Sequence, residues 1–552
     1  MKKRPRLILV LAGMMLTYFS GCGPQTLPPP KPRIVIVLVI EQLRYDYLVR
    51  FGSLFSGGLA ELAREGAVFT NARHRHALTE CAPGHATLLT GCYPSQHGIV
   101  GDQWYDRSRR RLVSSVEDSS CTILNSPFRA NAFGKSPRQL LRTTLGDWLK
   151  AEDSSSQVIS LASSDLAAIL MGGRRADAAY WFDPTSGKFS SSTHHLPGLP
   201  AWVKKWNDAA PGDRFFNATW EKLLTEADYL LSREDLFVAE ADGIHTTFPH
   251  PLNEEGESLG ANFYQRLAAS PFGDELVLEF ALATLRAQQL GKDEHADLLC
   301  LGLSATHSIG KTYGPLSQEQ QDNLVRLDLN LGNFLEEVER EIGREHLLVA
   351  LASDHGVLPL PEELRRRGFE AARVSAEEAH EEITGALQEL ANAKPDSVLI
   401  AYAHNGLYLH TPGFGNGAIQ TQAQIAAHLR TLSFVADVFT AGELASQATE
   451  AREYGDVFRN GYFAGRSPEI LFRRKPYFLI GGPRGTAAGS MYDYDTHVPL
   501  IFWGEGLKAG HYEMPCSTVD FAPTLAHWLG LSIPREVAGQ KLTMESDGLV
   551  QK

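Results

Sequence analysis

Four side chains that can bind a metal ion or transfer a proton follow three separate apolar runs of the sequence. They are Glu41, His307, Asp354 and His355. Carboxylate oxygens and imidazole nitrogens are common zinc ligands in proteins. A single polar residue after a strand usually belongs to a turn. Three such positions at one edge of a sheet, where α/β proteins bind their ligands, predict a metal centre.

The apolar runs before these residues are predicted to be buried β-strands. The clearest is 34–40 (IVIVLVI), and the others are 297–303, 347–352 and 498–503. Unbroken β-branched runs are typical of strands covered on both faces. Between the second and third runs, apolar residues recur at three- and four-residue spacing from Leu324 to Val338, which predicts a helix. Together these patterns predict an α/β fold with a mainly parallel sheet sandwiched by helices.

Two segments differ in composition from the predicted sheet and its helices. Residues from about 104 to 290 are rich in serine, glycine, tryptophan and tyrosine, and are predicted to form an inserted cap over the ligand-binding edge. Residues from about 375 to 475 are predicted to form a second insertion. It begins with acidic residues that are typical of a solvated helix face. Both insertions would belong to one large domain that spans residues 33–545.

The composition excludes several classes of protein. The chain has 552 residues, of which 43% are hydrophobic and 21% are charged, a balance typical of a folded globular protein. Its net charge of −13 disfavours binding to nucleic acid, because proteins neutralise the phosphate backbone with lysine and arginine side chains. Six cysteines are too few for a disulfide-stapled scaffold of this length. We therefore expect no nucleic-acid partner.

The first 22 residues are predicted to be an export signal. A basic start is followed by an apolar run of about twelve residues, too short to span a bilayer, and then by small residues before Cys22. This order resembles a bacterial lipoprotein signal with Cys22 as the lipidated residue, and an ordinary cleaved signal is the alternative. The proline-rich residues 23–32 would then form a tether. The expected location is the cell envelope, lipid-anchored to the membrane or periplasmic.

Four further cysteines would meet oxidising conditions at that location. They are Cys92, Cys121, Cys300 and Cys516. They could form up to two disulfides, and the sequence does not determine the pairing.

Two adjacent motifs resemble a known family. The run 81–91 (CAPGHATLLTG) and the following run 93–101 (YPSQHGIVG) resemble the nucleophile region of the alkaline phosphatase superfamily, in the branch that contains type I phosphodiesterases and nucleotide pyrophosphatases. The likeness is closest to the phosphate-irrepressible alkaline phosphatases and covers about residues 33–545. Shorter stretches agree at 179–183, 353–356, 494–499 and 519–524. The resemblance implies an alkaline-phosphatase-like fold, two zinc ions and a threonine nucleophile that forms a phospho-threonine intermediate.

This chain departs from the family pattern at most of the site positions that the resemblance carries over. The changed positions are Glu41 for the first-strand aspartate, Cys81 for the nucleophilic threonine, Asp102 for the asparagine after the second motif, His307 and Lys311 for the Asp-x-x-Gly-His pair, and Ser164-Asp165-Leu166 for the phosphate-gripping Lys-Asp-Arg. Asp354, His355 and His497 agree with the family, and Ala488 stands where relatives commonly have histidine.

With these changes, the ligand positions carried over from the family leave one well-formed zinc site, with a second zinc as the alternative. The first zinc would be bound by Glu41, Cys81, Asp354 and His355, a closed set of four donors that is typical of a structural site. The second would retain only His307 and His497. Lys311 offers no lone pair at neutral pH, and its charge could replace that of the missing ion.

The changed residues favour a degenerate family member with reduced or lost phosphate-ester hydrolysis, which would bind a small molecule or protein in the old active-site cleft. Leu166 cannot form the bidentate contact of arginine with phosphate, and Asp102 would repel the substrate. The alternative is an active phosphoric-ester hydrolase in which Cys81 replaces threonine as the nucleophile. A third reading is a sulfatase-like hydrolase. His85, however, occupies the position of the arginine in the sulfatase motif Cys-x-Pro-x-Arg.

Overall fold

The computed structural model describes residues 31–125, 133–241, 243–391, 399–403, 405–410, 418–446, 449 and 451–544. The predicted signal with Cys22, and the tether up to residue 30, lie outside these residues. None of the helices in the described ranges combines the length and the apolar character that a bilayer span requires.

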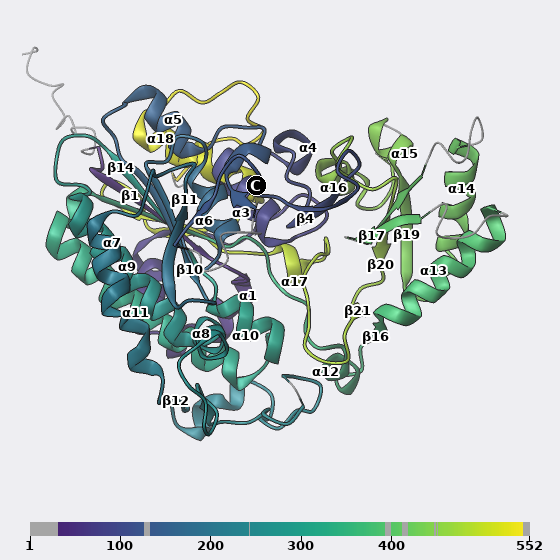
Figure 1. Cartoon of the computed structure of the whole chain (residues 1–552), viewed down its shortest axis with the longest axis horizontal. Coiled ribbons are helices and arrows are strands. Elements are labelled where there is room, and N and C mark those ends of the chain that lie inside the picture. The colour runs from purple at the N-terminus through teal and green to yellow at the C-terminus, as the bar shows by residue number, and fades with distance from the viewer. Residues whose placement is uncertain are drawn as a thin grey trace, which may run out of the picture.

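A ten-stranded sheet forms the centre of the main body (Figure 1). Its five central strands, from β15 to β10, are mutually parallel, and β22 and β11 flank them in the antiparallel sense. In spatial order the strands are β23 (Gly510–Tyr512), β2 (Ala67–Phe69), β22 (Leu500–Gly504), β15 (Leu347–Ala352), β1 (Ile34–Ile40), β14 (Asp297–Leu303), β9 (Val158–Ala162), β10 (Ala178–Asp183), β11 (Lys188–Ser192) and β7 (Ile123–Leu124).

Three of the four predicted strands have the expected bounds and are adjacent in the sheet. β1 lies between β14 and β15, with Ile40 opposite Leu303 and Val39 opposite Ala352. The carboxyl ends of the three strands are therefore level, and the residues that follow them reach the same place. The fourth strand begins two residues later than predicted, at Leu500, and runs antiparallel to β15.

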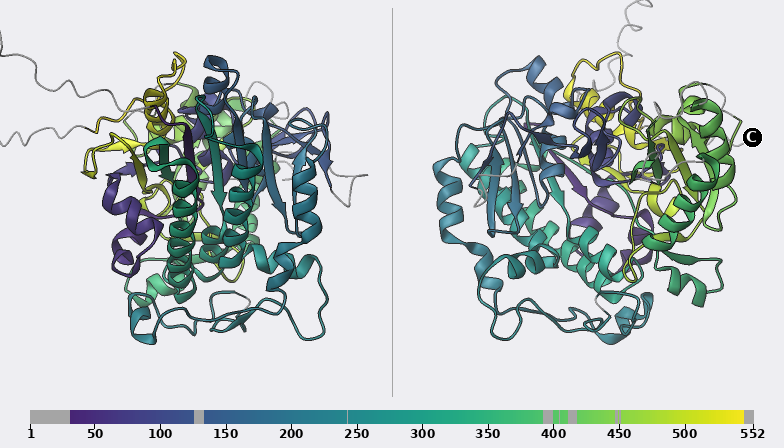
Figure 2. Two further views of the ribbon diagram at one scale, coloured as in Figure 1. Left: turned by 90° about the vertical axis from the view of Figure 1, so that its left-hand side faces the viewer. Right: turned by 45° about the vertical axis from the view of Figure 1, so that its right-hand side comes forward.

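Helices cover both faces of the sheet, as the continuous apolar character of its strands requires (Figure 2). Alternate residues of β1 point to opposite faces, so its isoleucines and Leu38 pack with one set of helices and its valines with the other. The first set is α2 (Gly58–Glu65), α9 (Pro271–Gln288) and α11 (Gln318–Ile342), and the second is α3 (Cys81–Thr90), α5 (Leu145–Glu152), α6 (Asp165–Gly172) and α18 (Phe521–Leu529). α11 contains the helix predicted from the apolar spacing.

The prediction that residues 104–290 form only an inserted cap is wrong. This segment supplies β9, β10 and β11 to the central sheet, and α5, α6 and α9 to its two faces. Its aromatic residues are core residues, since Tyr180 of β10 is fully buried with its ring 5.6 Å from that of Phe280 on α9. The composition was misleading because large aromatic side chains fill the space between a sheet and its covering helices as well as they line a binding site.

A smaller unit lies beside the main body, at the right of Figure 1. Its four-stranded sheet has the order β17-β18-β20-β19, and two helices pack on it with a separate apolar core. The elements are β17 (Leu399–Ala403), β18 (Gly406–Leu409), β19 (Val435–Thr440), β20 (Ile470–Arg474), α13 (Ala376–Ala391) and α14 (Ala418–Leu429). This unit corresponds to the second predicted insertion, residues 375–475.

The five described cysteines are free thiols, so the anticipated disulfides among Cys92, Cys121, Cys300 and Cys516 do not form in this structure. Two of the four residues, Cys92 and Cys121, lie in connecting segments, and the other two lie in different strands. Cys300 lies inside β14 and Cys516 in the short strand β24 (Cys516–Ser517). A disulfide requires two α-carbons about 4.4–6.8 Å apart, a condition that sequence spacing alone cannot establish.

Candidate metal centre

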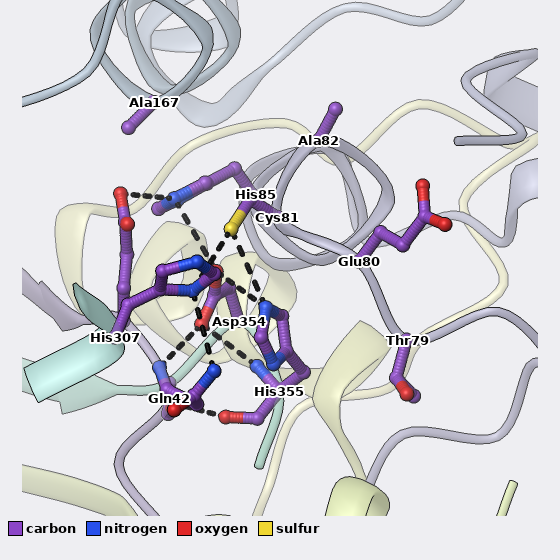
Figure 3. A network of polar contacts seen from close by, with 12 residues as sticks. Gln42, Thr79, Glu80, Cys81, Ala82, His85, Ala167, His307, Asp354 and His355 are labelled. Atoms are coloured by element: carbon purple, nitrogen blue, oxygen red, sulfur yellow. Dashed lines mark hydrogen bonds and ion pairs between the residues drawn. The ribbon is translucent and has the colours of Figure 1, made fainter. Parts of the chain in front are cut away.

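Four segments deliver polar side chains to the carboxyl edge of the central strands (Figure 3). Glu41 and Gln42 follow β1, and Asp354 and His355 follow β15. His307 lies in the first turn of α10 (Ala305–Tyr313), the helix that follows β14. Cys81 is the first residue of α3. The structure therefore brings together residues separated by up to 314 positions in the sequence, as the predicted strand ends implied.

The Cys81 sulfur lies between two imidazole rings. Its Sγ is 3.3 Å from His355 Nε2 and 3.6 Å from His307 Nδ1. His355 Nδ1 donates a hydrogen bond to the Gly356 carbonyl oxygen at 2.6 Å. In the neutral ring this bond places the proton on Nδ1 and leaves the lone pair of Nε2 directed at the sulfur.

Two carboxylates complete the cluster. Asp354 Oδ1 accepts hydrogen bonds from the backbone N–H groups of Gln42 (2.9 Å) and His355 (2.8 Å). Asp354 Oδ2 is buried with no hydrogen-bond partner and lies 3.4 Å from His355 Nε2. Glu41 Oε1 accepts a hydrogen bond from His85 Nε2 at 3.3 Å. An unpaired buried carboxylate oxygen costs free energy, which a bound cation would offset.

The protonation states at the site follow from burial and from the concentration of negative charge. Burial raises the pKa of the Cys81 thiol well above its usual range, and the carboxylates of Asp354, Glu41 and Asp102 raise it further. Burial lowers the pKa of His307 to about 4, so this ring is neutral at pH 7. A metal cation favours the thiolate and the neutral imidazole. The donor set of sulfur, nitrogen and oxygen therefore fits a zinc ion.

His307 is held in place through a buried carboxylate at the start of its helix. Asp274 on α9 accepts hydrogen bonds from the backbone N–H groups of Ser304 and Ala305, at 3.0 and 3.1 Å, through the same oxygen. Its other carboxylate oxygen has no hydrogen-bond partner. Burial raises the pKa of Asp274 to about 7.

Substituting Asp274→Asn is expected to stabilise the protein above pH 7 and to change its stability little below about pH 4. The carboxyl group ionises near its ordinary pKa of about 4 in the unfolded chain and near 7 in the folded protein. The wild-type free energy of unfolding therefore falls as the pH rises from about 4 to about 7 and is level above that. Asparagine retains an oxygen to accept both backbone hydrogen bonds and carries no charge. A difference of one in pKa corresponds to about 1.4 kcal/mol, so the expected gain is a few kcal/mol.

Urea unfolding of the variant and of the wild type at pH 4 and pH 8 measures this difference. An equal difference in stability at both pH values would show that Asp274 does not titrate in the folded protein.

The structure places His497, predicted to be a ligand of a second zinc, outside the cluster. Its Nε2 donates a hydrogen bond to the Thr70 carbonyl oxygen at 2.8 Å, and its ring stacks on Tyr45 with 4.7 Å between centroids. In this structure the residue lines a pocket together with Arg44 and Asp46, and its role as a zinc ligand stays a prediction. Among the described residues, the groups able to hold a metal comprise Cys81 with His307 and His355, and Cys81 with Glu41 and Asp354.

Lys311 and Asp102 lie at the border of the site. Lys311 is exposed one helical turn after His307, and its charge contributes to the lowered pKa of that ring. Asp102 Oδ1 accepts a hydrogen bond from the backbone N–H of Ala82 at 2.8 Å, so it satisfies an amide at the start of α3. The carboxylate of Asp102 thus has a structural partner beside Cys81.

Two residues of the site were missed in the sequence. No role in the site was predicted for His85, yet its fully buried Nε2 lies 3.3 Å from Glu41 Oε1 and 3.8 Å from Asp354 Oδ2. Its position four residues after Cys81 places both on one face of α3, a spacing that could have identified it. Gln42 was also missed, although it contacts Asp354 through its backbone and His307 through its side chain.

Basic side chains that could grip a phosphate group are engaged elsewhere. Lys135 pairs with Asp165 at 3.1 Å, at the start of α6. Arg174, which could in principle replace the missing arginine, donates a hydrogen bond to the Leu140 carbonyl oxygen. Leu166 provides no charge. The surroundings of Cys81 are therefore rich in carboxylates and poor in cations.

A family model for type I phosphodiesterase/nucleotide pyrophosphatase matches residues 35–411, more than half of the chain. The chain belongs to this family. The matched region begins in β1 and contains Cys81, His307, Asp354 and His355, so the candidate metal centre lies within the family domain.

Relatives in this phosphodiesterase family match nearly the whole chain. Alkaline phosphatase PafA of Elizabethkingia meningoseptica is 29% identical over 560 residues, covering 97% of each chain. Alkaline phosphatase PhoV of Synechococcus elongatus is 30% identical and covers 94% of each chain. A crystal structure of PafA superimposes with a TM-score of 0.86 over 93% of this chain and 99% of that chain, at 28% identity. These matches confirm the resemblance and the alkaline-phosphatase-like α/β fold.

Proposed function

We propose that this protein binds one metal ion at the Cys81 centre and has reduced or lost the phosphate-ester hydrolysis for which its relatives are named. In this proposal it acts by holding a small molecule or a protein partner at the carboxyl edge of the sheet. The observation that carries the proposal is the negative charge around Cys81. Burial and three nearby carboxylates raise the pKa of its thiol. The positions that match the phosphate-binding lysine and arginine of the family hold Ser164 and Leu166.

A phosphate monoester carries two negative charges at alkaline pH and requires cationic groups to bind and to stabilise its transition state. One divalent ion would neutralise two of the three carboxylates and leave little net attraction for the substrate. A metal-bound thiolate is also a weaker nucleophile than a free one, and a site with four protein ligands keeps no open position for water. These effects all oppose hydrolysis.

The full-length match to named alkaline phosphatases supports the alternative, an active hydrolase with Cys81 as the nucleophile. Here the sulfur would attack phosphorus and displace the alcohol of the ester, and water would later cleave the S–P bond to release phosphate and restore the thiol. This mechanism requires the thiolate in contact with substrate. The raised pKa of Cys81 disfavours a thiolate unless a metal is bound.

Hydrolysis of p-nitrophenyl phosphate by the zinc-loaded protein is expected to be at least about 1,000-fold slower than by PhoV assayed in parallel. Loss of a single preorganised donor commonly costs about 100- to 1,000-fold in rate, and this chain lacks several. The Cys81→Ala variant should show the same residual rate. A rate comparable with that of PhoV, abolished in Cys81→Ala, would instead establish a cysteine-dependent phosphatase.

A further inference from the structure

Three nitrogen and sulfur donors converge on one point, and one of them, His307, was not among the ligands predicted for the first zinc. Cys81 Sγ, His307 Nδ1 and His355 Nε2 all lie within 4.8 Å of one another. His307 was expected to serve a second metal ion, and its partners there are Lys311, which is exposed, and His497, which lies outside the cluster. His307 therefore has no second metal site to complete and faces the first.

The separations of these atoms match a tetrahedral zinc site. Zinc bonds of about 2.3 Å to sulfur and 2.0–2.1 Å to nitrogen, at a tetrahedral angle, place the two donors about 3.6 Å apart. The observed distances from Cys81 Sγ are 3.6 Å to His307 Nδ1 and 3.3 Å to His355 Nε2. Only small side-chain shifts separate the observed positions from a ligating arrangement.

The ring of His307 presents a lone pair to this position. The side-chain amide nitrogen of Gln42 lies 3.4 Å from His307 Nδ1 and donates to it, which places the ring proton on Nε2. Nδ1 then has two long contacts in this structure, to the Gln42 amide at 3.4 Å and to Cys81 Sγ at 3.6 Å, and both are weak as hydrogen bonds. A metal ion can replace the amide as the partner of that nitrogen.

Asp354 offers the fourth donor. Two backbone N–H groups fix its Oδ1, so the orientation of the carboxylate is set and Oδ2 remains without a hydrogen-bond partner. Oδ2 lies 3.4 Å from His355 Nε2, close to the separation expected for two donors on one tetrahedral zinc ion, about 3.4 Å.

Glu41 is occupied by another partner. His85 Nε2 donates to Glu41 Oε1, and both side chains are buried. The extra methylene of glutamate, relative to the family's aspartate, lets the carboxylate reach His85. Glu41 thus lies near the centre, within 4.8 Å of the Cys81 sulfur. Its Oε1 is already hydrogen-bonded to the imidazole of His85, which borders the metal ligands.

We propose that a single zinc ion is bound by Cys81, His307, His355 and Asp354, with Glu41 and His85 as an outer hydrogen-bonded pair. This ligand set rests on the proposed one-metal function. It differs from the set implied by the family resemblance in that His307 replaces Glu41. It merges residues from the two zinc positions of the family into one site of thiolate, two imidazoles and a carboxylate.

Cobalt(II) titration of the metal-free protein tests the ligand set, because thiolate coordination gives a charge-transfer absorption and the visible bands report the geometry. His307→Ala is expected to weaken cobalt and zinc binding by more than about 100-fold, since even outer hydrogen-bond partners of ligands contribute about 10- to 100-fold. Glu41→Gln is expected to retain stoichiometric binding and the wild-type cobalt spectrum. His497→Ala, a matched histidine outside the cluster, should also bind as the wild type does.

Circular dichroism spectra and thermal unfolding of each metal-free variant separate loss of a ligand from loss of the fold. If His307→Ala unfolds, His307→Gln gives the same comparison with a side chain closer in size. Wild-type affinity in the folded His307 variant, together with loss of metal in Glu41→Gln, would overturn the ligand set and leave the one-metal proposal intact. Two zinc ions per wild-type chain would overturn the one-metal proposal itself.

Discussion

Cys81→Ala is expected to reduce the zinc content of the purified protein from about one ion per chain to nearly none. The thiolate is the softest and most strongly bound donor of the centre, and its sulfur contacts both histidines. Alanine would leave two imidazoles and carboxylates around a gap at the first residue of α3. Elemental mass spectrometry of the dialysed protein measures the metal content directly.

Loss of the metal should also remove its contribution to stability. A ligand present at about 100 times its dissociation constant stabilises the folded state by about 2.7 kcal/mol. A chelator should therefore lower the unfolding temperature of the wild type and have almost no effect on Cys81→Ala. Cys516→Ala, which removes a half-buried thiol far along the sequence, serves as the control and should keep its zinc. Equal metal content in both variants would exclude Cys81 as a ligand.

Gly84→Ala is expected to destabilise the protein by about 2–3 kcal/mol and to displace Asp354. A methyl group on Gly84 would lie 2.7 and 2.8 Å from backbone carbon atoms of Asp354, closer than packed atoms approach one another. Both sides of this contact are backbone, so neither can turn away. Overpacking of a buried position typically costs about 1–3 kcal/mol. The same shift should weaken zinc binding, which cobalt titration measures together with urea unfolding.

Gly385→Ala is the matched control and should change the stability in the opposite direction. Gly385 lies in α13, and a methyl group there would meet no atom within 4 Å. Alanine is favoured over glycine inside a helix by about 0.5–1 kcal/mol, so this variant should be slightly more stable and bind zinc normally. A Gly84→Ala variant with unchanged stability would mean that α3 can move away from the strand end without cost.

Apolar patterning determined the centre of the fold. The run from Ile34 to Ile40 and the two runs that pair with it have no polar residue facing solvent, and only a strand covered on both faces can bury every side chain. The segment from 104 to 290 was misjudged because its strands are short and aromatic. Their place in the sheet depends on pairing with β14, a partner distant in sequence.

Residue types likewise predicted the centre before its geometry was known. Glu41, Asp354 and His355 directly follow apolar runs, and parallel strands place such residues at one edge. The place of His497 outside the cluster was not predictable, because a short motif fixes neither the direction of a side chain nor its hydrogen-bond partner. The Thr70 carbonyl oxygen that holds this ring belongs to a segment more than 400 residues earlier.

The sequence by itself therefore determined the parallel core and the edge at which the polar residues gather. Each of these follows from residue type and local order along the chain. The tertiary structure decided which donors share one centre, since it directs His307 toward Cys81 and pairs Glu41 with His85. Distances of a few ångströms between α10, α3 and the end of β1 arise from helix packing on the sheet, and no local pattern encodes them.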